Sequence, residues 1–469
     1  MTLPVPADVI SRLKAVLGDG GWSQDPDRLA PKLVEWRDRW SGTTPLLALP
    51  KTTAEVAAVV GICAESGTAI TPQGGNTGLV GGQIPDGEVL LSLERMRAVR
   101  ETNTLDDVLV VEAGVSLAAA HEAAEAVGRR FPLSLASEGS ATIGGLVSTN
   151  AGGVAVLRYG TMRQLVLGLE AVLPNGEVWN GLKRLRKDNT GYDLKQLLIG
   201  AEGTLGVVTA AALKLFPVLA SKAVAIAGVE NPAAAVALLG RAKDVSGGAV
   251  ESFELMSRLG IELALRHIPG AREPLESRPP WYVLIEIASG EPGAAEGAME
   301  RSLDAAMQDG LALDAAIAQT ETQAKAFWAL RENQSAAQKS EGAAWKHDIA
   351  VPVSRIAEFL DTAGAALQRV WPGVRIDAFG HVGDGNIHYD VLSAPGGDAA
   401  AHNGRRVAAA HLVHDIVVGL EGSISAEHGL GTMKTAEAMA YKSPTELAAQ
   451  RAVRAALDPK RIMNPRVLF

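Results

Sequence analysis

Short apolar runs separated by turns dominate the first half of the chain and predict β-strands. They lie at 46–49, 68–72, 89–93, 98–101, 108–113 and 165–173. Thr52 or Thr53 can cap a helix ending near Ser66, and an amphipathic pattern predicts another at 117–127. Asn175-Gly176 is typical of a hairpin turn. Residues 1–43 form a polar, mostly helical lead.

The pattern changes near Ser221, where strand-like runs begin to alternate with Ala-rich helical stretches. Strands are predicted at 223–229, 281–288, 311–318 and 349–351, and helices at 232–239, 255–265, 293–307 and 327–335. This rhythm favours an α+β domain. The predicted order is a lead at 1–43, a first domain at 44–219, a second domain at 220–420 and a C-terminal segment at 421–469.

Length and composition are consistent with this division and exclude some classes of protein. A chain of 469 residues is too long for one ordinary core, so two or three domains are expected. The net charge of −9 argues against nucleic-acid and anionic-membrane partners. A single cysteine, Cys63, excludes an internal disulfide framework, and its apolar helical surroundings predict a buried, inert thiol.

The first residues and the lengths of the apolar runs indicate where in the cell the protein is expected. The first six residues lack the basic and apolar regions of a secretory signal. No apolar run approaches the roughly 18 residues that a spanning helix needs. We therefore expect a cytoplasmic protein without a transmembrane segment.

Five glycines stand within ten residues at 73–82, directly between two predicted strands. Such a loop lets the backbone approach a ligand closely, and its N–H groups can form a nest for a diphosphate. The alternative is a mobile surface turn. Neither G-x-G-x-x-G before a helix nor G-x-x-x-x-G-K-[ST] occurs, which disfavours a standard nicotinamide site or P-loop. Further glycine-rich segments lie at 139–153 and 199–209.

A second concentration of chemistry lies near the C-terminus. His381 and His388 flank a glycine-rich turn, and Glu427 and His428 follow later. Two imidazoles and a carboxylate suit Zn²⁺, and also Mn²⁺ or Fe²⁺. The same groups could instead hydrogen-bond one another in a polar core, or transfer protons.

Cationic and hydroxyl side chains lie just before this stretch. Helical i, i+4 spacing puts Arg331 and Ser335 on one face, and Lys346 precedes the strand at 349–351. If they converge, they would bind a carboxylate, with Arg331 supplying a planar fork. The alternative is that both cations are solvated surface charges. The remaining histidines, at 121, 267, 402, 411 and 414, are expected on helix faces or the surface, while His347 could face the pocket or point away.

The segments PQGGNTGLVGG, GSATIGGLVSTNAGG and GAEGTLGVVT, in this order, resemble the FAD-binding domain of the vanillyl-alcohol oxidase (PCMH-type) family. The resemblance covers 44–219 and implies that these loops bind FAD, noncovalently because no His or Cys stands in the first loop. It implies cofactor contacts from Gly74, Gly75, Asn76, Thr77, Gly78, Gly82, Ser140, Thr142, Gly145, Asn150, Glu202 and Val208.

The motifs FGHVGDGNIH, SAEHGLG and DPKRIMNP extend the resemblance to the D-2-hydroxyacid dehydrogenase branch, closest to the D-2-hydroxyglutarate enzymes. It implies a metal on His381, His388 and Glu427 that binds the substrate, His428 as base, and hydride transfer to flavin N5. It also implies that the C-terminal segment returns to the flavin with Asn464. Substrate contacts are implied for Arg331, Ser335, Lys346, Asn386 and Asp390.

Asp390 departs from this branch, where Asn is common, and an acid there would repel a substrate carboxylate. D-2-hydroxyglutarate is the expected substrate, with D-lactate or glycolate as the nearest alternative. An alkyl-glycerone-phosphate synthase and a flavin electron-transfer or binding module are more remote. The resemblance also implies an electron-transfer flavoprotein or quinone as electron acceptor, and a homodimer.

Overall fold

The computed structural model describes residues 4–468, which form two compact units. Unit 1 contains the described residues up to Gly153, Gly160–Pro217, and the chain from Glu427 onward. Unit 2 contains Val154–Tyr159 and Val218–Ala426. The predicted α+β class is confirmed. Residues 1–3 and 469 of the predicted outer segments lie outside the described residues.

Unit 1 holds three small sheets, with strand orders β1-β2-β4-β3, β5-β6-β10-β8-β9 and β11-β7. Its strands are β1 (Trp22–Ser23), β2 (Leu47–Ala48), β3 (Ile70–Gln73), β4 (Val89–Ser92), β5 (Val99–Asn103), β6 (Val108–Glu112), β7 (Arg129–Arg130), β8 (Val166–Val172), β9 (Val178–Gly181), β10 (Val207–Lys214) and β11 (Phe216–Pro217). Its helices are α1 (Ala7–Leu17), α2 (Pro26–Leu33), α3 (Thr53–Ser66), α4 (Leu117–Glu125), α5 (Ile143–Ser148), α7 (Met162–Leu165), α8 (Lys195–Leu198), α17 (Thr435–Tyr441) and α18 (Pro444–Leu457).

Helix α3 is central to the core of unit 1. As predicted, it begins after Thr52, whose side chain accepts the N–H of Glu55 at 3.1 Å, and it ends at Ser66. Its apolar side packs with α1 and the parallel strands β2, β4 and β3. Cys63 lies in this core, where burial raises the pKa of its thiol to about 12. The predicted burial of this thiol is confirmed, and the raised pKa is consistent with an inert group.

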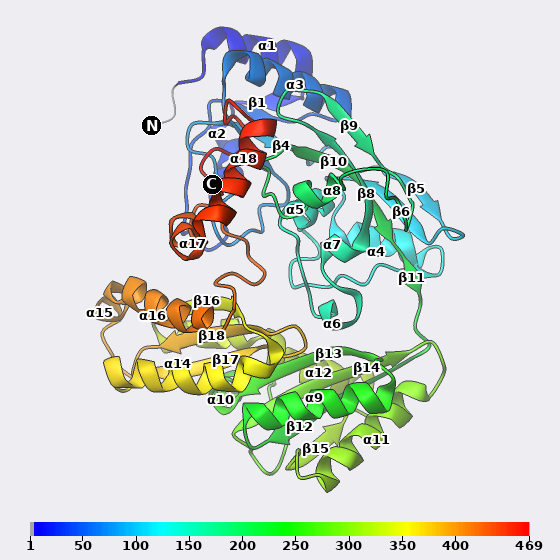
Figure 1. Cartoon of the computed structure of the whole chain (residues 1–469), viewed down its shortest axis with the longest axis vertical. Helices are drawn as coiled ribbons and strands as arrows, with labels where there is room; N and C mark the ends of the chain where they lie inside the picture. Colours follow the sequence, from blue (N-terminus) through cyan, green and yellow to red (C-terminus); the bar gives the residue numbers. More distant parts are fainter. Residues whose placement is uncertain (1–3, 469) are drawn as a thin grey trace. The chain divides into compact units, whose positions relative to one another are not determined.

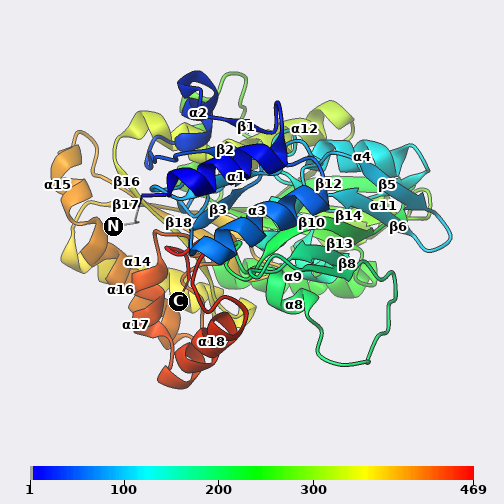
Figure 2. The same cartoon turned by 90° about the horizontal axis from the view of Figure 1, so that it is seen from above.

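The five-stranded sheet of unit 1 is antiparallel throughout. The predicted turn after β8 is present, with Gly176 at φ 86°, and leads into β9. Beyond β9, the loop at 182–194 extends away from the sheet, as Figure 2 shows. The strands of this sheet pair with one another, so a ligand site in this part of unit 1 would be formed by the connecting loops, including the glycine-rich ones.

The C-terminal tail of unit 1 runs beside β3 and is held by one buried arginine. Ile70 exchanges backbone hydrogen bonds with Ile462 and Asn464, at 2.8 Å each. The Arg454 guanidinium, on α18, donates to the carbonyls of Val467 at 2.6 Å and Met463 at 2.8 Å. Burial lowers the pKa of Arg454 to about 10, which leaves it charged at neutral pH. The tail is therefore fastened by charge-assisted hydrogen bonds. Because Arg454 is buried, water cannot take its place as the donor to these carbonyls.

Replacing Arg454 with Met is expected to loosen the tail, because buried carbonyls lose their donor. The loss is about 2–4 kcal/mol on the scale of unsatisfied buried groups. Thermal unfolding and limited proteolysis of the C-terminal tail measure it. Arg451→Met, an exposed change on the same helix, is the control. Equal melting temperatures and equal tail protection for the two variants would contradict this role.

Unit 2 is built on one seven-stranded sheet with strand order β15-β12-β14-β13-β17-β18-β16. Its strands are β12 (Ser221–Val229), β13 (Val250–Ser257), β14 (Trp281–Ser289), β15 (Asp314–Ile317), β16 (Ala344–Ala350), β17 (Arg375–His381) and β18 (Asn386–Leu392). Its helices are α6 (Val156–Tyr159), α9 (Pro232–Ser246), α10 (Arg258–His267), α11 (Ala294–Gln308), α12 (Glu321–Glu332), α13 (Gln334–Ala337), α14 (Ile356–Val370), α15 (Ala399–Gly404) and α16 (Arg406–Gly419), with 3₁₀ turns at Gln338–Glu341 and Val353–Arg355.

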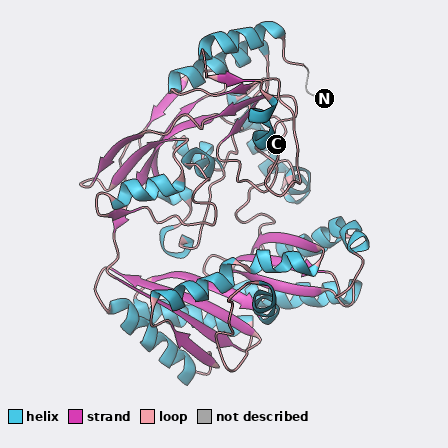
Figure 3. Cartoon of the chain, turned by 180° about the vertical axis from the view of Figure 1, so that it is seen from behind, coloured by secondary structure: helices cyan, strands magenta, loops and turns pink. Residues whose placement is uncertain are grey.

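The two faces of this sheet have different coverings. On one face, α9, α11, α14 and α16 pack over alternating apolar residues such as Phe253, Ile285 and Tyr389. Helices α9 and α14 lie in front of the strands of this sheet in Figure 1, and Figure 3 shows the strands as one layer with helices against it. On the other face, α10 and α12 cover β12, β14 and β13. The β17-β18-β16 end of that second face carries polar side chains instead, and these are described below.

Three sequence predictions for unit 2 are wrong in detail. Residues 255–257 belong to strand β13, which the sequence pattern missed, and α10 starts only at Arg258. The strand predicted at 349–351 begins at Ala344, so Lys346 lies inside it. The helix predicted at 327–335 ends at Glu332 and resumes at Gln334 as α13. At the break, the Asn333 amide donates to the Ala329 carbonyl at 2.8 Å. Arg331 therefore lies on α12 and Ser335 on α13, instead of on one continuous helix.

Two histidines expected on helix faces or the surface lie in helices α15 and α16, but both are buried. His402 and His414 are 4% and 3% exposed. The His402 ring stacks on Trp345 at a centroid distance of 3.9 Å. His347 points away from Lys346, into the apolar face, where its Nδ1 lies 2.8 Å from the Tyr389 carbonyl. Helices α15 and α16 pack against this face, so their inward positions are core positions even where they carry imidazole.

Candidate active site

The stretch around His381 and His388 is a β-hairpin, with β17 and β18 joined by the turn 382–385. Cross-strand partners in an antiparallel pair project to the same face. His381 lies opposite Asn386, Phe379 opposite His388, and Asp377 opposite Asp390. The hairpin therefore places both imidazoles, an amide and two carboxylates on one face of the sheet.

The neighbouring strands extend this polar face. On β16, Lys346 lies opposite Asp390 and Asp348 opposite His388. On β13, Glu254 lies opposite His381. The period-2 alternation of four strands thus collects one set of charged and polar groups on a face whose reverse side is apolar core.

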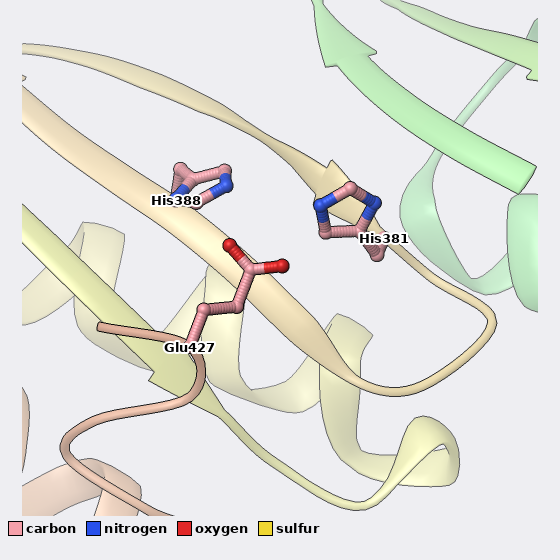
Figure 4. A group of neighbouring side chains, drawn as sticks. All are labelled: His381, His388 and Glu427. Atoms are coloured by element: carbon pink, nitrogen blue, oxygen red, sulfur yellow. The ribbon is translucent and has the colours of Figure 1, made fainter. Parts of the chain in front are cut away.

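The three predicted metal ligands come together at the end of this face. One potential ligand atom from each of His381, His388 and Glu427 lies within 4.8 Å of the other two. Figure 4 shows the Glu427 carboxylate directed between the two rings. Glu427 directly follows Ala426, whose N–H donates to the Asp348 carbonyl at 3.3 Å, so the chain delivers Glu427 to this edge of the sheet. Two nitrogen donors and a carboxylate fit a Zn²⁺, Mn²⁺ or Fe²⁺ ion with open positions.

Glu254 is a site residue that the sequence did not reveal. Its carboxylate accepts from His381 Nδ1 at 2.6 Å and from Arg331 Nε at 2.8 Å, and its side chain is 1% exposed. Burial acts to raise the pKa of Glu254, but the charges of His381 and Arg331 outweigh it and lower the pKa to about 2. A carboxylate on Nδ1 leaves Nε2 of His381 for an ion, as is usual for metal-binding histidines.

Glu254 also places Arg331 beside the histidines. The guanidinium carbon lies 5.0 Å from the centre of the Phe379 ring, which in turn lies 5.1 Å from that of His388. Arg331 is buried at 9% exposure, and Nε is its only hydrogen-bonding nitrogen among residues 4–468. Its terminal amino groups can therefore bind an anionic ligand. Ser335 is half-buried on the following helix.

Lys346 and Asp390 form an ion pair on the same face. Lys346 Nζ lies 2.8 Å from Asp390 Oδ2 and 2.6 Å from Gln338 Oε1. The Asn386 amide donates to Asp348 Oδ1 at 3.0 Å and to the Ile349 carbonyl at 2.9 Å. Its buried oxygen has no hydrogen-bond partner within the described chain. His428 is half-buried in the loop after Glu427.

In unit 1, the first glycine-rich loop lies against the second. A Cβ at Gly75 would overlap the Ser140 carbonyl, and a Cβ at Gly74 would overlap the Thr142 hydroxyl. Gly145 packs beside the same hydroxyl. Thr142 Oγ1 is buried without a hydrogen-bond partner in the part of the chain that the structure describes. This backbone-lined cradle with an unpaired polar atom fits a diphosphate group.

The other predicted cofactor residues mainly shape these loops. Asn76, at φ 56°, donates to the carbonyls of Pro31 and Val34 at 3.1 and 2.9 Å. Asn150 accepts from Thr161 and Arg163 at 2.9 and 3.0 Å. Thr77, beside Asn76, makes no side-chain hydrogen bond within residues 4–468, while Gly78 and Val208, the latter within β10, have no polar side chain.

Glu202 and Asn464 tie three segments of unit 1 together. The Glu202 carboxylate accepts the N–H groups of Leu430 and Gly431 at 2.9 and 2.8 Å. The Asn464 amide donates to the carbonyls of Gly82 and Glu202 at 2.9 and 2.8 Å. The segment that follows His428 is thus linked, through Glu202 and Asn464, to the first glycine-rich loop.

Comparison with known protein families gives a match in each of the two units. Residues 44–181 match the FAD binding domain model, and residues 219–468 match the model for FAD linked oxidases, C-terminal domain. The chain belongs to the FAD-linked oxidase family. The predicted resemblance to the PCMH-type flavoenzymes and their D-2-hydroxyacid dehydrogenase branch is confirmed, as is the prediction of a flavin-dependent enzyme.

Individual relatives cover nearly the whole chain. A mitochondrial D-2-hydroxyglutarate dehydrogenase of Bos taurus is 39% identical over 464 residues, covering 98% of this chain and 83% of the relative. A D-2-hydroxyglutarate dehydrogenase of Xanthomonas citri pv. viticola is 36% identical over 437 residues, covering 93% and 91%. The structure of p-cresol methylhydroxylase with substrate bound has a TM-score of 0.77 at 16% identity, covering 99% and 98%, and shows the shared fold.

Membership of the FAD-linked oxidase family assigns FAD to unit 1, whose paired glycine loops fit it. Metal binding by His381, His388 and Glu427 stays a prediction. None of the helices within residues 4–468 combines the length and apolar character needed to cross a bilayer.

Glu254→Gln is expected to weaken Zn²⁺ binding by about 10- to 100-fold, the usual range for losing a carboxylate behind a histidine ligand. A glutamine amide cannot accept hydrogen bonds from both His381 and Arg331 through two equivalent oxygens. Zn²⁺ titration with a competing chelator measures the affinity. Glu262→Gln, on the exposed side of α10, is the control. Unchanged affinity in Glu254→Gln would show that this carboxylate does not orient a ligand.

Proposed function

We propose that this flavoenzyme oxidises a D-2-hydroxy acid to the 2-keto acid, with a divalent ion on His381, His388 and Glu427. D-2-hydroxyglutarate, giving 2-oxoglutarate, is the first candidate substrate, because it is the substrate named for the bovine and Xanthomonas relatives. The observation that carries the proposal is the convergence of these three side chains beside Arg331.

Oxidising a 2-hydroxy acid removes a proton from the hydroxyl and a hydride from Cα. FAD, when bound, accepts the hydride at N5. The ion would act as a Lewis acid for the α-hydroxyl and carboxylate. His428 would take the hydroxyl proton, because a histidine titrates near neutral pH. Arg331 would hold a carboxylate through its terminal amino groups, kept in place by Glu254.

Other side chains would orient the substrate. Ser335 offers a hydroxyl, and Lys346 offers an ammonium donor on the same sheet face as His388. Asn386, with its unpaired oxygen, could accept a hydrogen bond from a ligand. Burial of the polar face among paired charges would exclude bulk water from the reacting centre.

D-lactate or glycolate dehydrogenation is the second candidate, and the Lys346–Asp390 pair favours it. An ammonium already matched by a carboxylate attracts a second substrate carboxylate less strongly. An electron-transfer or binding module would not need the three-ligand set. The electron acceptor (an electron-transfer flavoprotein or quinone), the homodimer, the noncovalent attachment of FAD and the cytoplasmic location stay predictions; the bovine relative is named as mitochondrial.

Anaerobic bleaching of the flavin absorbance tests the reaction class. D-2-hydroxyglutarate, D-lactate, glycolate and the L-enantiomers of the chiral acids would be mixed in turn with the FAD-loaded enzyme. We expect rapid bleaching by at least one D-acid or glycolate, and slow or no bleaching by L-acids. A flavin that none of these acids reduces would refute the proposal.

His428→Ala is expected to lower the rate of flavin reduction by roughly 10²- to 10⁴-fold, the usual contribution of a general base. FAD content should stay unchanged, because the predicted FAD contacts lie elsewhere. His411→Ala, an exposed change on α16, is the matched control. A His428→Ala enzyme with a near-normal reduction rate would remove His428 from the mechanism.

A further inference from the structure

The Lys346–Asp390 pair is built into the sheet. The two residues are direct cross-strand partners, and Asp390 is 3% exposed. Lys346 Nζ uses one donor on Asp390 and one on Gln338, which leaves the third of its three donors. Asp390 is two residues along β18 from His388, about 7 Å in an extended strand. A short 2-hydroxy acid with its hydroxyl group at the histidines would therefore place its other end near Asp390.

The two long cationic side chains on this face each already have a carboxylate partner. Arg331 is paired with Glu254, and Lys346 with Asp390. Asp377 lies opposite Asp390 on β17, and Ser257 and Gln338 donate to its carboxylate at 2.7 and 2.8 Å. Burial raises the pKa of Asp377 to about 6. The far end of the face therefore carries no net positive charge for a second substrate carboxylate.

Polar groups at this end suit an uncharged ligand instead. Asp390 Oδ1 has no hydrogen bond among residues 4–468, and Lys346 keeps a donor. An acceptor beside a donor matches a carboxamide or a hydroxyl group, each of which can both donate and accept. A carboxylate would bring only acceptors, and its charge would meet that of Asp390.

Resting on the proposed reaction, but favouring its monocarboxylate candidates over D-2-hydroxyglutarate, we propose that Asp390 is a specificity-determining residue. It selects D-2-hydroxy acids whose far end is uncharged and discriminates against dicarboxylates.

The test compares two substrates of nearly equal shape, D-2-hydroxyglutarate and its 5-amide, D-2-hydroxyglutaramate. The ratio of their kcat/KM values, measured on the FAD-loaded enzyme with a dye acceptor, reports the charge preference. The wild-type enzyme is expected to favour the amide by about tenfold or more. Asp390→Asn frees the Lys346 charge and should shift the ratio toward the dicarboxylate by about tenfold or more. Asp361→Asn, an exposed change on α14, should leave the ratio unchanged.

A wild-type preference for the dicarboxylate, or an equal ratio in wild type and Asp390→Asn, would overturn the proposal. The wild-type ratio needs no variant, so it decides even if Asp390→Asn fails to fold, which its FAD content and melting temperature would reveal. If no hydroxy acid reduces the wild-type flavin, the proposed function fails and this inference fails with it. If both compounds are oxidised without the predicted ratios, only the role of Asp390 fails.

Discussion

A carboxylate buried in a protein must be matched by positive or hydrogen-donating neighbours, and the site in unit 2 depends on how Glu254 meets this requirement. At 1% exposure, it is satisfied by one nitrogen of His381 and one of Arg331. The same contact fixes which nitrogen His381 presents to an ion and where Arg331 stands. The predicted metal ligand His381 and the proposed substrate-binding cation Arg331 are thereby held by a single buried acid, which leaves neither side chain free to rotate independently.

The loops of unit 1 are likewise held by a small number of hydrogen bonds between segments far apart in sequence. Asn464 and Glu202 link the carbonyl of Gly82 to the backbone at 430–431. At Gly74 and Gly75 the packing leaves no room for a side chain, so the backbone of this loop, together with the Thr142 hydroxyl, can face a ligand. Arg454 fastens the tail that carries Asn464. Contacts far apart in sequence thus shape a cradle whose loops make few polar side-chain contacts of their own.

Much of the fold and the site could be predicted from sequence because the signals were local. Thr52 and Glu55 marked the start of α3, and the glycine loops and the two-histidine hairpin stood out as motifs. Strand β13 was missed because Glu251 and Glu254 break its apolar pattern, and their burial depends on partners distant in sequence: Arg158 and Tyr159, and Arg331 and His381. Asp390 stood out in the sequence as an unexpected acid, but its pairing with Lys346 was hidden, since only strand register reveals it.

We expect turnover to require an ion held by His381, His388 and Glu427. The direct measurement strips metal from the FAD-loaded enzyme with a chelator and follows anaerobic flavin reduction by a D-2-hydroxy acid as Zn²⁺ is added back. FAD should stay bound, flavin reduction should nearly stop without metal, and it should recover as Zn²⁺ is added up to one ion per chain. Full flavin reduction by an enzyme shown to contain no metal would contradict it.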